Sequence, residues 1–343
     1  MTNDLDKTLE DLGERLIVQD IVAPFCHGAG DDCAIISRSE ESLVITTDPV
    51  PEPAAKLIGG DDDPYWMGWL LVVINASDLA AAGATPVAFV SAVSAPADLS
   101  VERLKRFLAG TSDACTSERL RYVGGNLRES ASLGAVGTAI GVRSASLKLS
   151  RSGGADGDLV VSVGDGGIFW RDALTIREQR GELDREKSPL FKPRSETKAM
   201  CTLAEAGLVR AAMDNSDGLL PTLEQLAAAN GLRILLDLDS LGVEGADTLE
   251  TDPARLWLGW GDWNVVAVVR ENDWVEARDL VHAAGCSAFA IGQLEGGGAR
   301  VELRRGSKRM EAPRLESERF SKDSWFRGGI ESYVDLLLNV ELP

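Results

Sequence analysis

The sequence predicts a fold of the α/β to α+β class, divided into two domains. The chain has 343 residues, of which 44% are hydrophobic and 26% charged, which is enough for two ordinary cores. Segments with strand-like and helix-like patterns alternate along its first part. A glycine-rich polar stretch over residues 151–158 follows them. Such stretches are typical of linkers, so we expect domains at residues 1–147 and 148–343.

The first domain is expected to begin with an amphipathic helix over residues 5–18, where four leucines recur at helical spacing. Residues 33–36 and 43–47 predict two strands joined by a polar turn. Residues 68–83 are apolar on nearly all sides and predict a buried helix that ends at Gly83. A strand, an amphipathic helix, a tight turn and a second strand should follow, at residues 89–93, 101–121, 124–126 and 134–142.

The second domain shows the same rhythm of strands and helices. Strands are expected at residues 159–163, 233–238, 265–269 and 288–291, and helices at residues 219–230 and 274–284. The charged residues 177–187 favour a helix or a loop. No fixed-period repeat relates the two halves.

Composition excludes several classes of protein. The net charge of −19 argues against nucleic-acid binding, although a metal ion could still bridge the acidic protein to a phosphate ligand. Five scattered cysteines without a CxxC pair indicate a reducing cytoplasm rather than a disulfide scaffold. The two histidines disfavour a zinc site or a Ser-His-Asp triad. The sequence contains neither a signal-peptide pattern nor an apolar run of membrane-spanning length.

Acidic residues at turns and helix ends are the groups that indicate chemistry. They are Asp31 and Asp32, Asp48 after Thr46 and Thr47, Asp78, Asp214 with Ser216 and Asp217, and Asp262. The chain has no phosphate-binding P-loop, dinucleotide fingerprint or eukaryotic-type kinase signature. Mg²⁺ prefers oxygen ligands, and carboxylates gathered in one cleft repel one another unless a cation lies between them. The pattern therefore predicts metal-assisted phosphoryl transfer.

Each acidic group also has a plainer interpretation. Asp31 and Asp32 could form an ordinary turn, Asp48 could cap a helix or lie in a loop, and Ser216 or Asp217 could be a simple N-cap. Asp78 differs, because a lone carboxylate in an apolar helix is costly to bury without a partner.

The order of six motifs resembles the thiamine-monophosphate kinase family. They are GDDCAII (30–36), TTD (46–48), NASDLAAAGATP (75–86), GGN (124–126), RSGGADGD (151–158) and DNSDGL (214–219), and they run through most of the chain. This family shares a superfamily with aminoimidazole ribonucleotide synthetase, selenophosphate synthetase and a hydrogenase-maturation protein.

The resemblance implies an N-terminal domain that dimerises through its sheet into a barrel-like interface, and a C-terminal α+β domain that completes a cleft for ATP and Mg²⁺. It implies a small-molecule substrate, thiamine monophosphate, phosphorylated directly by ATP. By matched position, the implied metal ligands are Asp32, Thr46, Thr47, Asp48, Asp78, Asp214 and Asp217. Gly125, Asn126, Arg151 and Ser216 match nucleotide contacts, Asp217 is the implied catalytic residue beside the transferred phosphoryl group, and Asp262 matches a substrate position.

The chain departs from the family pattern mainly in the substrate half. Asn126 replaces an aspartate, Ala55 and Lys56 replace a His-Phe pair, and Asn264 replaces a glutamate. The family's aromatic C-terminal element has no clear counterpart near residues 328–333. Two alternatives therefore stay open: an ATP-dependent enzyme of the same superfamily with another small-molecule substrate, and a non-catalytic nucleotide-binding relative.

Overall fold

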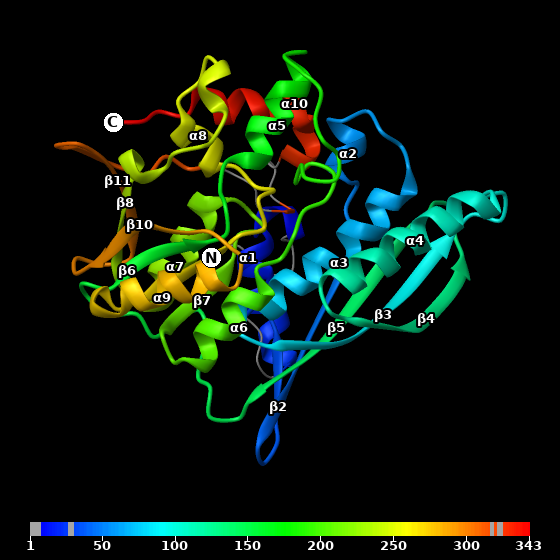
Figure 1. The fold of residues 1–343 in the computed structure, drawn as a ribbon, viewed down its shortest axis with the longest axis horizontal. Helices are drawn as coiled ribbons and strands as arrows, with labels where there is room; N and C mark the ends of the chain where they lie inside the picture. The colour runs from blue at the N-terminus through cyan, green and yellow to red at the C-terminus, as the bar shows by residue number, and fades with distance from the viewer. Residues whose placement is uncertain (1–7, 27–30, 316–318, 321–324) are drawn as a thin grey trace.

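The computed structural model describes residues 8–26, 31–315, 319–320 and 325–343. It contains two β-sheets, the first formed between residues 34 and 144 and the second between residues 159 and 311 (Figure 1). Both sheets contain mainly antiparallel strands and carry helices, so the predicted α+β architecture is confirmed.

The first sheet has five strands in the order β1-β2-β5-β3-β4. They are β1 (Ala34–Ser37), β2 (Glu41–Pro49), β3 (Thr85–Ala95), β4 (Arg121–Glu129) and β5 (Gly134–Ser144). β3 and β4 are parallel, and the other neighbours are antiparallel. Within the described chain this sheet is open, with β1 and β4 at its edges.

Two helices, α3 (Pro64–Ala81) and α4 (Val101–Ser117), pack together against the first sheet (Figure 1). Asp63 caps α3 by accepting a hydrogen bond from the Tyr65 N–H, and Pro64 occupies the first turn, where no amide donor is needed. Gly83 follows the helix at φ 62°. α3 is buried over nearly its whole length, as predicted. None of the helices described is long and apolar enough to cross a membrane.

The second sheet has seven strands in the order β12-β11-β8-β10-β6-β9-β7. They are β6 (Leu159–Val163), β7 (Val209–Asp214), β8 (Arg233–Asp237), β9 (Val265–Val269), β10 (Ala288–Glu295), β11 (Arg300–Arg305) and β12 (Lys308–Glu311). β8 and β11 are parallel, and the remaining pairs are antiparallel.

Helices cover both faces of the second sheet. They are α5 (Ile168–Arg177), α6 (Thr197–Glu205), α7 (Leu219–Asn230), α8 (Pro253–Leu258), α9 (Trp274–Ala283) and α10 (Trp325–Asn339). Because strand side chains alternate, β9 sends Val265 and Val269 into the cluster with α6 and α9 and sends Val266 into the cluster with α7. An unbroken apolar strand is therefore required here.

The expectation of a single helix over residues 5–18 is wrong within the described residues 8–18. This region forms short turns, namely a 3₁₀ turn at Leu9–Asp11, α1 (Glu14–Leu16), a π-helical turn at Ile17–Val22 and a 3₁₀ turn at Ala23–Phe25. Gly13 adopts φ 76° and interrupts the helical path. Residues 5–7 lie outside the described residues.

The expectation of a tight turn at residues 124–126 is also wrong. Gly124 and Gly125 lie within β4, where the register against β3 shifts between Phe89 and Ser91. Their φ angles are 117° and 155°. Glycine tolerates these angles, so it forms a bulge rather than reversing the chain. A Cβ on Gly125 would lie 1.8 Å from the Ser91 carbonyl oxygen, which is why this position requires glycine.

Candidate active site

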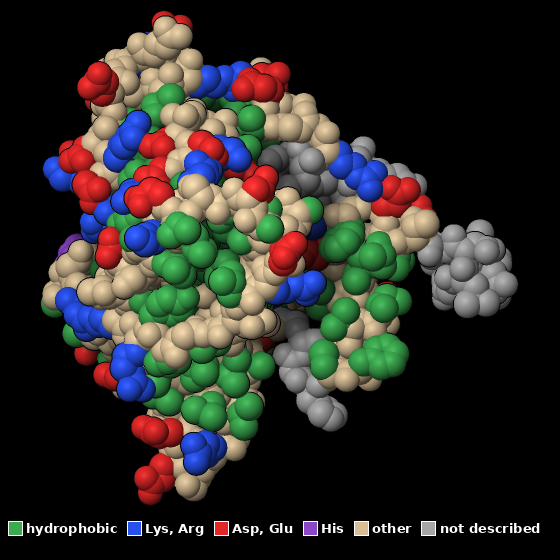
Figure 2. All heavy atoms as spheres, turned by 90° about the vertical axis from the view of Figure 1, so that its right-hand side faces the viewer, with side chains coloured by type: hydrophobic (Ala, Val, Ile, Leu, Met, Phe, Trp, Pro, Cys, Tyr) green, Lys and Arg blue, Asp and Glu red, His purple; other side chains and the backbone are tan. Residues whose placement is uncertain are grey.

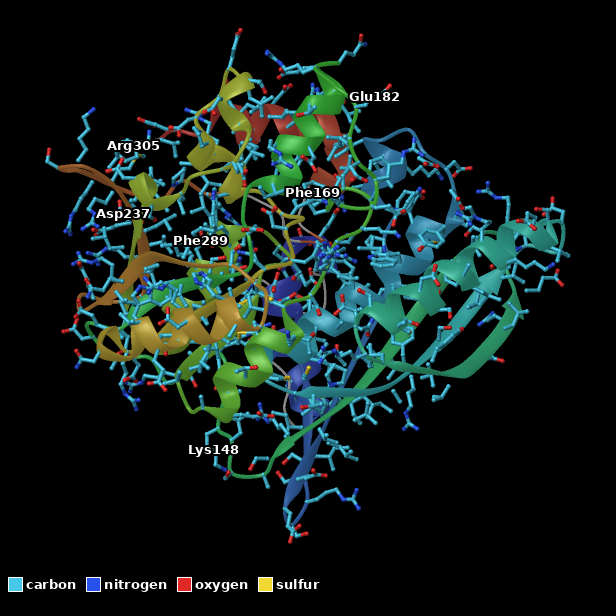
Figure 3. The ribbon with its side chains drawn as sticks, in the orientation of Figure 1. Lys148, Phe169, Glu182, Asp237, Phe289 and Arg305 are labelled. Carbon is cyan, nitrogen blue, oxygen red and sulfur yellow. The ribbon has the colours of Figure 1, made fainter. Side chains whose placement is uncertain are left out.

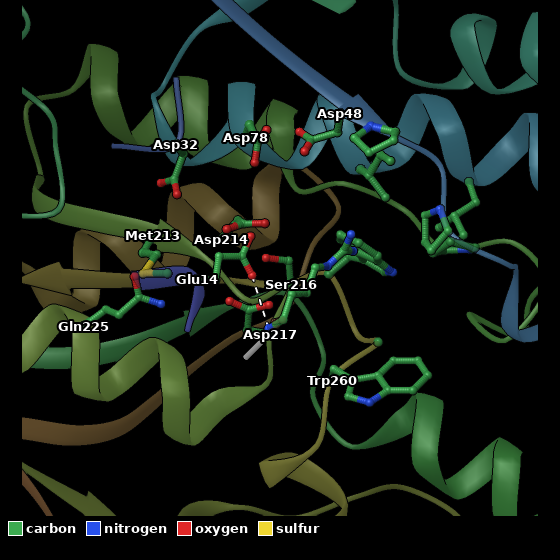
Figure 4. A pocket seen from close by; sticks show the side chains of 18 of the residues that line it. Glu14, Asp32, Asp48, Asp78, Met213, Asp214, Ser216, Asp217, Gln225 and Trp260 are labelled. Atoms are coloured by element: carbon green, nitrogen blue, oxygen red, sulfur yellow. Dashed lines mark hydrogen bonds between the residues drawn. The ribbon is translucent and has the colours of Figure 1, made fainter. Parts of the chain in front are cut away.

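A cavity of about 950 Å³ lies between the two sheets and is lined by residues of both. Its lining includes Asp31 and the five aspartates expected to bind metal: Asp32, Asp48, Asp78, Asp214 and Asp217. Figure 4 shows their side chains gathered in the same region of the cavity. Segments that are far apart in the chain are therefore brought together, as the metal-binding interpretation requires.

Three of these carboxylates form a tight group. Asp32 directly precedes the first sheet, Asp78 lies in the last turn of α3, and Asp214 ends β7. One oxygen from each lies within 4.8 Å of the others. Ser77 Oγ adds a contact to Asp214 Oδ2 at 3.4 Å. Oxygen ligands at this spacing fit a hard divalent cation such as Mg²⁺.

Burial and mutual repulsion disfavour the charged forms of these groups. Burial raises the pKa of Asp32 to about 6, although the neighbouring Arg151 guanidinium acts in the opposite direction. Burial, followed by repulsion from nearby aspartates, raises the pKa values of Asp78 and Asp214 well above the usual range. A cation between them would remove this repulsion and favour the ionised forms.

Side chains alternate along β2, so neighbouring residues of the TTD motif face opposite sides of the sheet. Thr46 is buried, and its hydroxyl lies within hydrogen-bond distance of Asp78 and, at 3.4 Å, of Asp48, so it borders the carboxylate group. Thr47 faces the other side of the sheet, where its hydroxyl donates to the Gly137 carbonyl at 2.9 Å. The structure therefore brings Thr46 and Asp48 to the site and leaves Thr47 outside it.

The cavity extends from the carboxylates in two directions. One end, the α7 arm, is bordered by Arg15, Arg151, Gln225, Ala228, Ala229 and Arg319. The other end, the aromatic arm, is bordered by Trp66, Phe169, Phe191, Trp260 and Trp263. In Figure 4, Gln225 and Trp260 lie on opposite sides of the carboxylates.

Arg151 reaches the site from the segment that joins the two sheets. Its guanidinium donates to Asp32 at 2.5 Å and to the Gln225 amide oxygen at 3.0 Å. Ser216 and Asp217 line the cavity beside it. Gln225 was missed from the sequence. Its position eight residues after Asp217, two turns along α7, is the signal that could have identified it.

Besides Thr46 and Thr47, three predicted residues lie outside the cavity lining. Gly125 and Asn126 pair with β3 near the open edge of the first sheet. Asp262 is turned inward, and its two oxygens accept hydrogen bonds from the Gly167 and Phe169 amides at 2.7 and 2.8 Å. Burial raises the pKa of Asp262 to about 7. Asp262 thus supports the start of α5, while its neighbours Gly261 and Trp263 face the cavity.

Comparison with known proteins identifies the family to which the chain belongs. The pattern for the AIR synthase related protein, N-terminal domain, matches residues 30–143, and that for its C-terminal domain matches residues 155–304. The thiamine-monophosphate kinase of Halobacterium salinarum is 32% identical over 75% of this chain and 85% of its own length. The chain belongs to the thiamine-monophosphate kinase family. The Pyrococcus abyssi member is 27% identical over 82% of this chain and 87% of its own.

Solved structures of the family share the fold. The thiamine-monophosphate kinase from Stenotrophomonas maltophilia superposes with a TM-score of 0.67, at 25% identity over 81% of this chain and 90% of that one. A ThiL complex with AMPPCP and TMP gives a TM-score of 0.74, at 23% identity over 89% of this chain and 98% of that one. The HypE-HypF complex, from the wider superfamily, gives 0.70 at 19% identity over 87% of this chain and 99% of that one.

The raised pKa values predict that Mg²⁺ stabilises this kinase-family protein more at about pH 8 than at about pH 5.5. Below about pH 4 the carboxyls are protonated in both the folded and unfolded states, so they do not affect stability. Above about pH 4 these carboxyls ionise in the unfolded chain at a lower pH than in the folded protein. The free energy of unfolding of the metal-free protein therefore falls as pH rises through about 6 for Asp32, and further for Asp78 and Asp214.

Added Mg²⁺ binds the ionised carboxylates and should reverse this loss. Thermal unfolding across this pH range, with Mg²⁺ or with a chelator, measures the effect. Proton release on Mg²⁺ addition in weak buffer provides an independent measurement. A Mg²⁺-dependent shift in Tm that is the same at both pH values would contradict the predicted coupling.

Proposed function

We propose that this protein transfers the γ-phosphoryl group of ATP to thiamine monophosphate, forming thiamine diphosphate and ADP. The observation that carries the proposal is the convergence of five carboxylates on one cavity, at positions matching the kinase motifs. The similarity to thiamine-monophosphate kinases along most of the chain supports the same activity.

In this proposal the two arms of the cavity separate the two substrates. Arg151, held between Asp32 and Gln225, would meet phosphate oxygens of ATP in the α7 arm. Asp32, Asp48, Asp78 and Asp214 would hold Mg²⁺, with Thr46 orienting the Asp48 and Asp78 carboxylates. Bound Mg²⁺ neutralises the charge on the triphosphate, which an acidic wall would otherwise repel.

Asp217 would act at the point of transfer. It lies in the turn before α7 and faces the cavity close to the other carboxylates. An oxygen of the acceptor phosphate attacks the γ-phosphorus, and the bond from the γ-phosphorus to the β–γ bridging oxygen breaks to release ADP. The acceptor phosphate is already ionised at neutral pH, so the transfer requires positioning and charge neutralisation rather than a general base.

A direct assay tests this activity. Purified protein with ATP, Mg²⁺ and thiamine monophosphate should form thiamine diphosphate and ADP in equal amounts, and chelation of Mg²⁺ should abolish both. Thiamine without its phosphate serves as the control acceptor. If ADP forms without thiamine diphosphate, or if no turnover occurs, thiamine monophosphate is not the substrate.

One observation favours a second candidate, an ATP-dependent enzyme with another small acceptor. Lys56, which stands in the family's His-Phe region, is paired with Glu52 and Asp62 at the surface. The acceptor side of the site therefore differs from the family pattern. A screen of metabolites for stimulated ADP release separates this candidate from the first and also tests the non-catalytic alternative.

We also propose a homodimer formed through the first sheet. Val123 and Leu127 on β4 are 57% and 59% exposed, and Val136 on β5 is 42% exposed. Figure 2 views the molecule from this side and shows hydrophobic side chains gathered there. Leu127→Glu should shift the sedimentation of the native protein from dimer to monomer. A wild type that sediments as a monomer at micromolar concentration would contradict the proposal.

Two further expectations remain proposals. The domain boundary at residue 147 agrees with the two matched family regions. A cytoplasmic location is supported by five cysteines that are all free thiols.

A further inference from the structure

The aromatic arm is connected to the carboxylates by one face of α3. Trp66, Leu70, Ile74 and Asp78 all line the cavity and recur every four residues. Residues at this spacing share a helix face, and Trp66 and Asp78 are roughly 18 Å apart along the axis. A molecule with a phosphate at the carboxylates could therefore extend along α3 and place its far end against Trp66.

Trp66 combines a flat apolar surface with an unused donor. The residue is 7% exposed, and its indole Nε1 has no hydrogen-bond acceptor among the described residues. Phe191 is 3% exposed and meets the Trp66 ring edge to face, with 5.3 Å between ring centroids. Because Trp66 lines the cavity, an acceptor atom of a bound molecule could complete the hydrogen bonding of this donor.

Trp66 and Phe191 form a wall of the cavity, and contacts with the second domain hold this wall in place. Phe191 belongs to the segment between α5 and α6, and Pro193 in that segment accepts a hydrogen bond from Trp69 Nε1 at 2.8 Å. Arg185 pairs with Asp61 at 2.5 Å, and Lys192 lies 4.7 Å from the centroid of the Trp69 ring. The acidic loop at residues 59–64 is thus a docking point for this segment, and the wall forms only where the two domains meet.

Charge separates the two ends of the cavity. The three arginines among the described lining residues lie at the α7 arm: Arg15 pairs with Glu224, Arg151 bonds to Gln225, and the Arg319 amide bonds to Glu14. The described lining of the aromatic arm contains neither Lys nor Arg. Arg185, over the Phe191 ring, and Lys192, over the Trp69 ring, lie outside the lining and are paired with Asp61 and Glu186. The lining of this end therefore favours an apolar, planar group.

We propose that Trp66 and Phe191 determine acceptor specificity by enclosing a planar heteroaromatic ring whose ring atom accepts a hydrogen bond from Trp66 Nε1. This inference rests on the proposed function, since it assigns the aromatic arm to the acceptor. The chain would then replace the family's His-Phe pair with a wall built across the domain boundary.

Steady-state kinetics on three variants test the assignment. Phe191→Leu removes the aromatic face, and Trp66→Phe keeps a ring but removes the donor. Each is expected to raise KM for thiamine monophosphate about three- to tenfold, with KM for ATP unchanged. Phe289→Leu is the matched control, because Phe289 lies on β10 of the second sheet, packs on Trp257 and does not line the cavity (Figure 3).

Calorimetry of thiamine monophosphate binding, with Mg²⁺ and a non-hydrolysable ATP analogue, gives a readout that does not need turnover. Weaker acceptor binding in both variants, with unchanged analogue binding, would support the inference. Unchanged acceptor binding, or equal losses for both ligands, would overturn it while the proposed kinase activity stands. A wild type that neither binds nor phosphorylates thiamine monophosphate would overturn both.

Discussion

Asp217→Asn is expected to lower kcat at least about 100-fold while leaving Tm nearly unchanged. The substitution keeps the shape of the side chain but removes the negative charge that would hold Mg²⁺ beside the transferring phosphoryl group. The structural role suggested by its position before α7 does not apply, because Gly218 is the N-cap of that helix and no side chain caps it. The charge should therefore matter to catalysis far more than to folding.

The measurement compares kcat for thiamine diphosphate formation with Tm for the wild type and the variant. Asp247→Asn is a suitable control, since Asp247 is an exposed aspartate in a 3₁₀ turn outside the cavity lining. If Asp217→Asn lost stability in proportion to its activity, Asp217 would be a structural residue and the catalytic assignment would be wrong.

Asp78→Asn should also have a large effect, a loss of about 100- to 1,000-fold in activity. Asp78 contributes one of the three closely grouped oxygens, and an amide supplies an oxygen without its charge. The free energy of unfolding of the metal-free protein should nevertheless be unchanged or higher at neutral pH. Burial and repulsion already disfavour the ionised carboxyl there, as its raised pKa indicates.

This combination of lost activity and retained stability distinguishes a metal ligand from a structural carboxylate. Asp172 provides the contrast, because it is 1% exposed and bonded to Arg171 and Ser188. Asp172→Asn removes the buried charge that pairs with the half-buried Arg171 guanidinium and should destabilise the fold. Denaturant unfolding without metal measures both variants. A destabilised Asp78→Asn protein would show that Asp78 acts in folding.

The elements most accurately predicted from the sequence are those whose pattern is dictated by burial. α7 and β9 begin and end where their apolar patterns do, and α3 was recognised because it is apolar on all sides. α5 and α8 were missed, because their tryptophans, Trp170 and Trp257, pack into a core shared with other elements. Local propensity is weak in such segments, and tertiary packing decides their structure.

The sequence by itself determined the order of the carboxylate motifs, the two-domain α+β fold and the need for a cation, because these follow from residue type and local periodicity. Only the tertiary structure decided which groups meet. It placed Asp32, Asp78 and Asp214 together, turned Asp262 inward and brought Phe191 against Trp66. Distances between side chains far apart in the chain depend on how sheets and helices pack, and no local pattern encodes that packing.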